Sequence, residues 1–472
     1  MAQQIETRQG PAAGFRMTRR TFVKLAAASG LAVAAGGGYK VATSGSNAKG
    51  RIVIIGGGAA GLSMASRLVR NLKRAQITLI DPADRQFYQP GFTLIAAGIY
   101  KPEQVYRKQS DFMPKGVNWV KKSVVAVDPA QNKVTVEGGD VFPYDFLVLA
   151  PGLQLNWGMV EGLSQKALGA GNVHCIYDFE GAQKTWPAIQ AFAIKGGRGI
   201  FTDTHTKIKC GGAPKKICLL TEHLARKVGN RDHVKIDYFS AAKELYDVPY
   251  FTPRLEEIYK ERKISVSLHN RVKGVDTAAK KVHFARVEKV AKQQADPQTG
   301  KTVTVEETVT TPFTEDYDFL HLVPPQSAPD FVRQSGLGWT EGKLAAEAWA
   351  MVDQATLVHL KYPNIVSLGD VAGIPTSKTS AAIRKQVPVA AKNLIALIEG
   401  KAPQAKYNGY AACPIITDYG HVLLCEFDYD KKPQNSFPFS LLDTSKELWP
   451  AWLLKVHVLK PLYFYGMLPG YC

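Results

Sequence analysis

The stretch RIVIIGGGAAG, residues 51–61, decides the fold, because a short β-branched strand runs directly into a glycine-rich turn. A helix-like segment follows through Leu72, and a second apolar strand at residues 77–80 ends in Asp81. Such a strand, a G-x-G-x-x-G turn, a helix and an acidic residue about twenty positions later form the fingerprint of a dinucleotide-binding βαβ unit. The sequence therefore predicts a Rossmann-like domain in an α/β protein.

Each glycine of this turn has its own role. Gly56 permits the tight turn, Gly58 lets the backbone approach a pyrophosphate, and Gly61 lets the helix pack closely against the strand. We expect the phosphates at the helix N-terminus. The Asp81 carboxylate can accept hydrogen bonds from a ribose.

Two later segments favour FAD over NAD as the dinucleotide. YDFLVLAPG at residues 144–152 resembles the strand that returns the chain to the FAD domain in flavoproteins with two dinucleotide-binding domains. IVSLGD at residues 365–370 ends in an acidic residue suited to the ribityl hydroxyls. Either segment alone also fits a buried strand that stops at a turn. Their order after the fingerprint favours the flavin.

A second α/β unit is expected at about residues 153–330. Its glycine-rich turn in the position of a nucleotide fingerprint is KCGGAPKK, residues 209–216, which opens a helix through Lys227. This turn is not a G-x-G-x-x-G, and Pro214 removes a backbone donor, so we infer that nicotinamide binding is absent. Instead, Cys210 stands at a helix N-terminus beside two lysines, and these are conditions that lower the pKa of a thiol.

Length and composition fit a globular protein with at least two units. A chain of 472 residues exceeds the size of one hydrophobic core, and an apolar fraction of 45% is ordinary. The net charge of +18 fits nucleic acid, anionic lipid or a small anionic substrate. No long basic run with interleaved aromatics occurs, so we expect no nucleic-acid partner. The six cysteines show no C-x-x-C pair and no histidine at zinc spacing, so no structural metal is predicted.

The N-terminus has the features of a twin-arginine export signal. TRRTFVK at residues 18–24 precedes a weakly hydrophobic run of small residues at 25–35; an ordinary basic amphipathic N-terminus is the alternative. The run is too short and too glycine-rich for a membrane span, so we expect it to be removed or kept as a weak anchor. Export would place the protein at the periplasmic face of the cytoplasmic membrane, where a long-range disulfide persists.

The C-terminal segment, residues 436–472, is rich in aliphatic and aromatic residues with basic residues interspersed. The helical spacing of its apolar groups fits two interpretations: packing on the core, or a pair of amphipathic helices in the membrane interface. The second would give a lipid-soluble quinone a point of entry, and the basic charge would help to hold the protein on anionic lipid. In contrast, the polar residues 287–311 predict a surface hairpin without chemistry.

Five segments in order resemble the sulfide:quinone oxidoreductase family, in the branch that includes the mitochondrial enzyme. They are FYQP at 87–90 with TL at 93–94, KCGGAP at 209–214, HLVPP at 321–325, GD at 369–370 with PTSKT at 375–379, and GY at 409–410 with CP at 413–414 and EFDY at 426–429. The similarity runs from Arg51 to about Phe439. It implies two Rossmann-like domains of the disulfide-reductase type, a noncovalent FAD and a C-terminal segment that faces the membrane.

We expect a domain plan of five parts along the chain. It comprises residues 1–49 as signal and linker, 50–152 as the first part of the FAD-binding domain, 153–330 as the second Rossmann-like domain, 331–435 as the second part of the FAD-binding domain, and 436–472 as the membrane-associating segment. The residues predicted to lie on FAD are Gly56, Gly58, Ala59, Ala60, Gly61, Asp81, Gln89, Val124, Gly152, Asp370, Lys378, Thr379, Ser380 and Ala381.

Carried over from the family, the catalytic residues are Cys210 and Cys413. Hydrosulfide would attack their disulfide and leave a persulfide on Cys413, and the freed Cys210 thiolate would deliver two electrons to FAD. A membrane quinone would take these electrons, and the persulfide sulfur would pass to a small acceptor. A thiolate is the competent nucleophile, and exchange needs a good leaving thiol. Cys175 stays outside this mechanism, since Tyr177 stands where some branches have a third cysteine.

Three further cysteines are expected to have no redox role: Cys218, Cys425 and Cys472.

Two alternative functions stay open at this point. The export signal fits the flavoprotein subunit of a flavocytochrome c sulfide dehydrogenase, which passes electrons to a cytochrome, and a flavin-binding interaction protein without activity is the other. Cys413-Pro414, residues 426–429 and the amphipathic tail favour quinone. The sequence leaves the oligomeric state open, a homo-oligomer included.

Overall fold

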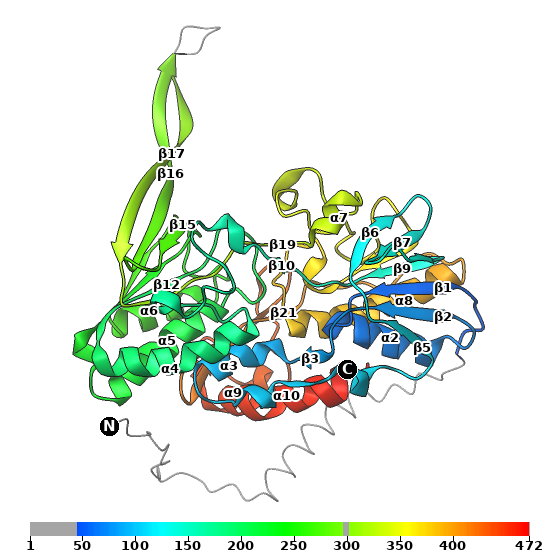
Figure 1. Cartoon of the computed structure of the whole chain (residues 1–472), viewed down its shortest axis with the longest axis horizontal. Coiled ribbons are helices and arrows are strands. Elements are labelled where there is room, and N and C mark those ends of the chain that lie inside the picture. Colours follow the sequence, from blue (N-terminus) through cyan, green and yellow to red (C-terminus); the bar gives the residue numbers. More distant parts are fainter. Residues whose placement is uncertain (1–44, 296–301, 472) are drawn as a thin grey trace, which may run out of the picture. The chain divides into compact units, whose positions relative to one another are not determined.

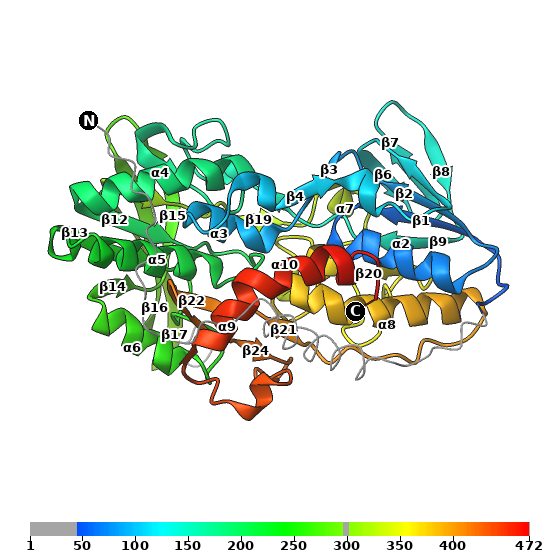
Figure 2. The ribbon, with the colours of Figure 1, turned by 90° about the horizontal axis from the view of Figure 1, so that it is seen from below.

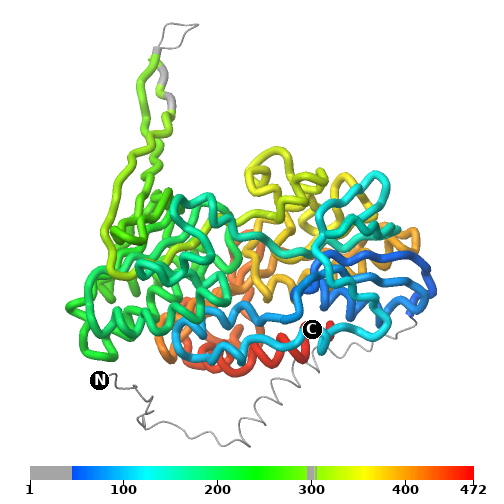
Figure 3. Tube along the Cα trace, viewed as in Figure 1, coloured from blue at the N-terminus to red at the C-terminus, as the bar shows by residue number. Residues whose placement is uncertain are grey.

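Two parallel sheets with helices packed against them make up the body of the protein (Figure 1). The structure is a computed structural model that describes residues 45–295 and 302–471. The chain leaves the first sheet, builds the second, and then returns to the first near residue 365 (Figure 3). This is the predicted α/β class with two Rossmann-like cores. The predicted export signal and Cys472 lie outside the described residues.

The first sheet contains the fingerprint strand and both predicted flavin-contact strands as three consecutive strands. In spatial order its strands are β20 (Ile365–Ser367), β9 (Phe146–Leu149), β1 (Arg51–Ile55), β2 (Gln76–Ile80) and β5 (Val117–Val120). All neighbouring pairs are parallel. β1 is buried at every position except Arg51, as expected for a central parallel strand covered on both faces.

Two helices of this sheet begin where the cofactor is expected. α2 (Ala59–Asn71) follows β1 directly, and α8 (Ser380–Ile398) follows β20 after a short connection. The two helices pack against each other. The predicted cofactor residues at the start of each helix therefore belong to the same domain.

The second sheet is also parallel. In spatial order its strands are β11 (Val173–His174), β18 (Phe319–His321), β12 (Gly197–Thr202), β13 (Val234–Phe239) and β14 (Ile264–Ser267). Its helices are α4 (Phe179–Lys195), α5 (Ala213–Lys227) and α6 (Thr252–Glu261). α5 begins directly after the turn that holds Cys210, as predicted.

α5 also links the second sheet to a distant part of the chain. It packs against β12 and β13, and it packs against β22 (Ile415–Asp418) as well. All of its first ten residues, Ala213 to Glu222, are buried. The segment just before β22 is thereby held beside the N-terminus of α5.

Antiparallel strands complete the fold. One sheet joins β6 (Val124–Asp128), β7 (Lys133–Val136) and β8 (Val141–Pro143), and another joins β15 (Asn270–Asp276), β16 (Lys281–Ala295) and β17 (Thr302–Asp316). Shorter sheets pair β3 (Arg85–Phe87) with β4 (Tyr106–Lys108), β10 (Gln154–Leu155) with β19 (Gln326–Ser327), β21 (Ala411–Ala412) with β24 (Glu426–Phe427), and β22 with β23 (His421–Leu423) and β25 (Glu447–Leu448).

The predicted surface hairpin is confirmed and is longer than expected. β16 and β17 pair from Lys281 with Asp316 to Ala295 with Thr302, whereas β15 accompanies β16 only as far as Arg286. Beyond that point the hairpin is two-stranded (Figure 1).

The C-terminal segment forms one helical run, not the expected pair of helices. The run consists of α9 (Trp449–Leu453), η10 (Leu454–Val458), α10 (Leu459–Leu462) and η11 (Tyr463–Met467). Pro450 lies in its first turn, where a backbone donor is not needed. Pro461 does not break the run, because wide π turns on both sides accommodate the change in the hydrogen-bond ladder.

The inner face of the run packs on the core, as one of the two interpretations expects. Val456, Tyr463 and Phe464 are buried in the core, and the Ser63 hydroxyl of α2 donates a 2.8 Å hydrogen bond to the Met467 carbonyl. α10 lies at the front of the molecule in Figure 2. In the same run Tyr465 is 68% exposed. Among the described residues, no helix has both the length and the apolar character needed to cross a membrane.

Candidate active site

The sulfur atoms of Cys210 and Cys413 lie 2.8 Å apart, although 203 residues separate them along the chain. Cys413 is buried, and Cys210 is partly exposed. The two thiols are well inside the reach of a disulfide, which needs about 2.05 Å between sulfurs. The fold thus brings together the two cysteines that the resemblance pairs.

Cys210 is held in the loop between β12 and α5 by backbone contacts. Its φ angle is +46°, in the left-handed region that a side chain with a Cβ rarely adopts. Its N–H donates to the Lys378 carbonyl at 2.8 Å, and its carbonyl accepts a 3.2 Å hydrogen bond from the Tyr177 hydroxyl. Strained backbone of this kind persists only where the surroundings fix it.

Cys413 follows β21 and is fixed from two sides. Its N–H donates to the Cys425 carbonyl at 2.8 Å. Its sulfur accepts a 3.3 Å hydrogen bond from the Gly212 N–H. A Cβ at position 212 would lie 2.9 Å from that sulfur, so only glycine allows the turn to approach so closely.

The two thiols are polarised in opposite directions. The pKa of Cys210 is well below its ordinary value, chiefly because Cys413 donates a hydrogen bond to its sulfur, and also because the Lys216 ammonium lies 3.1 Å away. The pKa of Cys413 is well above its ordinary value, because that hydrogen bond retains its proton and because it is buried. In the reduced pair Cys210 is therefore the thiolate and Cys413 the thiol.

Lys216 supplies the positive charge beside the cysteine pair. Its side chain is buried on α5, with the residue 3% exposed. Burial lowers the pKa of the Lys216 ammonium, but the negative charge of the cysteine pair, which lies on Cys210, outweighs this effect and raises it above the ordinary value. A buried ammonium is stable here because it has a thiolate partner.

The fingerprint turn has the shape of a phosphate cradle. A Cβ at Gly56 would lie 2.3 Å from the Ala150 carbonyl oxygen, and one at Gly61 would lie 1.8 Å from the Gly56 carbonyl oxygen. A Cβ at Gly58 would meet nothing within 4 Å, so open space remains at the N-terminus of α2, where Ala59 and Ala60 begin the helix. These residues fit the pyrophosphate of FAD.

The acidic residue of the fingerprint stands beside that cradle. The Asp81 carboxylate accepts hydrogen bonds from the Gly57 N–H at 2.6 Å and from the Gln109 side-chain amide at 3.1 Å. Gln109 is therefore a candidate site residue that the sequence reasoning missed. Gly152, with a φ of +79°, likewise faces open space, and Val124 starts β6 and packs against the core cluster that includes Ile80.

The remaining predicted cofactor residues converge on the Cys210 loop. Asp370 lies in the short helix η8 (Gly369–Val371) after β20, and burial raises the pKa of its carboxyl group. The Lys378 ammonium donates to the Asp370 carbonyl at 2.6 Å, and burial lowers the pKa of Lys378 to about 7. Thr379 caps α8 by accepting from the Ala382 N–H at 3.1 Å, and Ser380 and Ala381 form the first turn.

Lys209 joins these elements to the cysteine pair. Its backbone forms a bridge with Lys378, and its ammonium donates a 2.7 Å hydrogen bond to the Gln89 side chain. Gln89, Lys378 and Cys210 are therefore neighbours, although they come from three distant parts of the chain. The open cradle, the two helix N-termini and these donors together fit a dinucleotide that ends beside Cys210.

Lys455 is a further charged group near the pair. It lies on the C-terminal helical run and is 4% exposed. Burial lowers its pKa to about 7, and repulsion from Lys216 adds to this effect. Its ammonium lies 5.9 Å from the centroid of the Tyr88 ring. The only signal in the sequence is a lysine within an apolar helical run, which was insufficient to place it.

The other described cysteines lie apart from this chemistry. Cys175, Cys218 and Cys425 are buried, and burial raises the pKa of the Cys175 thiol to about 12. Cys218 and Cys425 belong to the hydrophobic core, as expected.

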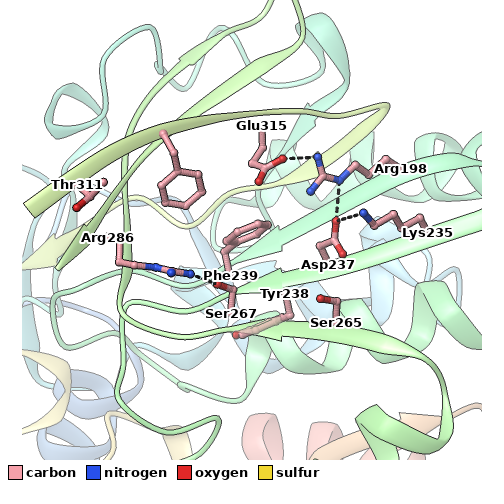
Figure 4. Close-up of a pocket in the computed structure, with 11 residues that line it drawn as sticks. Arg198, Lys235, Asp237, Tyr238, Phe239, Ser265, Ser267, Arg286, Thr311 and Glu315 are labelled. Atoms are coloured by element: carbon pink, nitrogen blue, oxygen red, sulfur yellow. Dashed lines mark hydrogen bonds and ion pairs between the residues drawn. The ribbon is translucent and has the colours of Figure 1, made fainter. Parts of the chain in front are cut away.

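A cavity of about 460 Å³ lies between β13, β14 and β17 (Figure 4). Its charges are largely paired with each other, since Arg198 contacts Asp237 at 2.6 Å and Glu315 at 2.5 Å. None of the predicted site residues lines it. The candidate active site is therefore the cysteine pair with the adjoining cradle.

Comparison with known proteins shows the family to which the chain is similar. Residues 50–306 match the pyridine nucleotide-disulphide oxidoreductase family. The chain is 36% identical over 421 residues to the mitochondrial sulfide:quinone oxidoreductase of Dictyostelium discoideum, which covers 89% of this chain and 86% of that protein. It is 33% identical over 420 residues to the mitochondrial sulfide:quinone oxidoreductase of Mus musculus, again with 89% and 86% covered.

The fold has a counterpart among solved structures. The sulfide:quinone oxidoreductase from the hyperthermophilic bacterium Aquifex aeolicus matches with a TM-score of 0.68 at 20% identity, covering 89% of this chain and 92% of that one. At this identity the likeness shows the fold. Family and fold both agree with FAD as the cofactor. From its sequence similarity over most of its length, the chain belongs to the sulfide:quinone oxidoreductase family.

Proposed function

We propose that this protein oxidises hydrosulfide through Cys210 and Cys413 and passes the two electrons by way of FAD to a membrane quinone. The observation that carries the proposal is the 2.8 Å separation of the two sulfurs, with the Lys216 ammonium 3.1 Å from Cys210. The pair stands at the turn where nicotinamide-dependent relatives bind their nucleotide.

The polarity of the pair supports a direction for the sulfur chemistry. Hydrosulfide attacks the Cys413 sulfur of the disulfide, a new sulfur–sulfur bond forms there, and the old bond breaks with Cys210 leaving as a thiolate. A thiol of low pKa leaves faster in such an exchange, and the Lys216 ammonium stabilises the thiolate. The product is a persulfide on Cys413, whose outer sulfur passes to a small acceptor.

The proposed cofactor residues are those that surround the cradle and the Cys210 loop. FAD, when bound, accepts two electrons from the sulfur chemistry and gives them to a quinone. The helix N-terminus at Gly58 to Gly61 would hold the pyrophosphate, Asp81 the ribose, and the residues from Lys378 to Ala381 the flavin end, together with Gln89, Val124, Gly152 and Asp370. The domain boundaries after residues 49, 152, 330 and 435 are part of this proposal.

We further propose that the protein is exported by its twin-arginine signal and lies on the periplasmic face of the membrane. The exposed apolar side chains of the C-terminal run, such as Trp449 at 51% and Tyr465 at 68%, support peripheral attachment there. A quinone would reach the enzyme from the lipid at this face.

The test follows the flavin spectrum of the purified, oxidised protein. Sulfide should bleach the flavin band, and a soluble quinone should restore it. Rapid reoxidation by cytochrome c with no reoxidation by quinone would replace the quinone proposal with the flavocytochrome alternative.

A further inference from the structure

A polar cavity lies beside the exposed apolar part of the C-terminal region. It has a volume of about 450 Å³, and its lining includes Lys385, Asn408, Gln434, Asn435, Ser436 and Ser440. We propose that this cavity binds the headgroup of an anionic phospholipid. The proposal rests on the membrane association proposed above and specifies the kind of lipid.

One cation, Lys385, lines the cavity, and a second, Arg384, lies over the ring of Tyr410, which also lines it. The Lys385 ammonium lies 5.6 Å and the Arg384 guanidinium 5.7 Å from the centroid of the same Tyr410 ring. Within the described part of the chain, no ion pair of 4.0 Å or less joins either of them to a carboxylate. Burial and the neighbouring Arg384 charge lower the pKa of Lys385 more than the Glu426 carboxylate raises it, so an anion near the two cations would relieve their repulsion.

The carboxylate near these cations, that of Glu426, already accepts hydrogen bonds from other groups. Glu426 is 5% exposed and accepts hydrogen bonds from the Tyr410 hydroxyl, from the Ser436 hydroxyl at 2.9 Å and from the Ser436 N–H at 2.9 Å. These donors offset its charge, so it competes weakly for Arg384 and Lys385. The cavity can therefore attract a phosphate despite the nearby Glu426 carboxylate.

The apolar neighbours of the cavity favour a lipid over a free anion. Phe437 is 66% exposed and directly follows Ser436, and Leu441 is 75% exposed and directly follows Ser440. One short segment thus supplies both the polar lining and two exposed apolar side chains. A phospholipid satisfies both features, because its headgroup is anionic and its acyl chains are apolar.

The test is flotation of the full-length protein with vesicles of phosphatidylcholine alone and with phosphatidylglycerol added. The double variant Arg384→Gln/Lys385→Gln is compared with Lys289→Gln/Lys292→Gln on the hairpin, which removes the same charge at a distant place. The first pair should weaken binding to the anionic vesicles by about 30-fold, since each basic group near the surface contributes about 1 kcal/mol. The hairpin pair should have little effect, and neither pair should alter binding to neutral vesicles.

A second variant guards against misfolding of the first. Ser440→Asp places a negative charge at the mouth of the cavity and should cause the same selective loss. Equal losses in the α8 pair and the hairpin pair would show attraction by net charge alone and would overturn the proposal. Saturable binding of glycerol 3-phosphate without vesicles would make a free anion the occupant and would overturn it too. Failure of the unaltered protein to bind any vesicle would defeat the proposed membrane association as well.

Discussion

At the residue scale, Cys210 and Cys413 differ in pKa chiefly because Cys413 donates the hydrogen bond that they share, and also because the Lys216 ammonium lies beside Cys210. If both are redox-active, Cys210→Ser or Cys413→Ser should lower the rate of flavin reduction by sulfide at least about a thousandfold, the scale of loss when a covalent nucleophile is removed. FAD should stay bound. Stopped-flow absorbance measures the rate, and Cys175→Ser is the matched control. Retained turnover in either variant would remove that residue from the mechanism.

Lys216 should control the acidity of the reduced pair. Replacement by Gln removes the ammonium 3.1 Å from the Cys210 sulfur, so the pKa of Cys210 should rise by about 1 to 3, the effect of losing an opposite charge at short range. The pH dependence of alkylation of the reduced protein measures this pKa. Lys227→Gln, an exposed lysine at the far end of the same helix, should leave it unchanged. An unaltered pKa in Lys216→Gln would show that the hydrogen bond from Cys413 alone holds the thiolate.

At the element scale, the C-terminal run has two faces with different roles. Removing it would uncover Tyr463 and Phe464, which are buried in the core, so exposed side chains are the better targets. Leu462→Ser/Tyr465→Ser should lower membrane affinity by about tenfold or more, because burying one such side chain in lipid contributes roughly 1.5–3 kcal/mol. Sedimentation with membranes measures this. Val290→Ser/Val309→Ser, on the exposed hairpin, is the matched control, and equal losses from both pairs would contradict the prediction.

The elements also show which predictions came from local pattern. Strands β1, β2, β9 and β20, the start of α5 and the β16–β17 hairpin agree with the sequence, because each depends on a few neighbouring residues and a turn. One of the two interpretations of the C-terminal segment expected a pair of helices, and the structure has one continuous helical run instead. Pro461 suggests a break locally, but packing against α2 and π turns on both sides keep the run continuous.

At the scale of the whole molecule, two paired histidines should make stability depend on pH. His174 and His321 are partners in the second sheet, and burial lowers their pKa values to about 4 and about 3. In the unfolded chain both take up protons near pH 6.5, so below that pH the unfolded state binds more protons. The free energy of unfolding should therefore fall as the pH drops from 7 toward 5, by up to about 1.4 kcal/mol per pH unit for each histidine.

Urea unfolding at several pH values measures this slope. His321→Gln should flatten it by up to about 1.4 kcal/mol per pH unit, whereas His283→Gln, on the exposed hairpin, should not. An unchanged slope in His321→Gln would show that this histidine is protonated in the folded protein.

The site shows the same division between local and distant causes. The sequence by itself determined the dinucleotide cradle and the special position of Cys210, because a glycine turn and a helix N-terminus are encoded within about ten residues. Only the tertiary structure decided that Cys413 meets Cys210, that Lys216 is the cation beside them, and that Lys455 is buried nearby. These contacts depend on α5 packing against β22 and on the C-terminal run packing against α2. Such packing joins residues far apart in the chain, so the spacing of neighbouring residues does not predict these contacts.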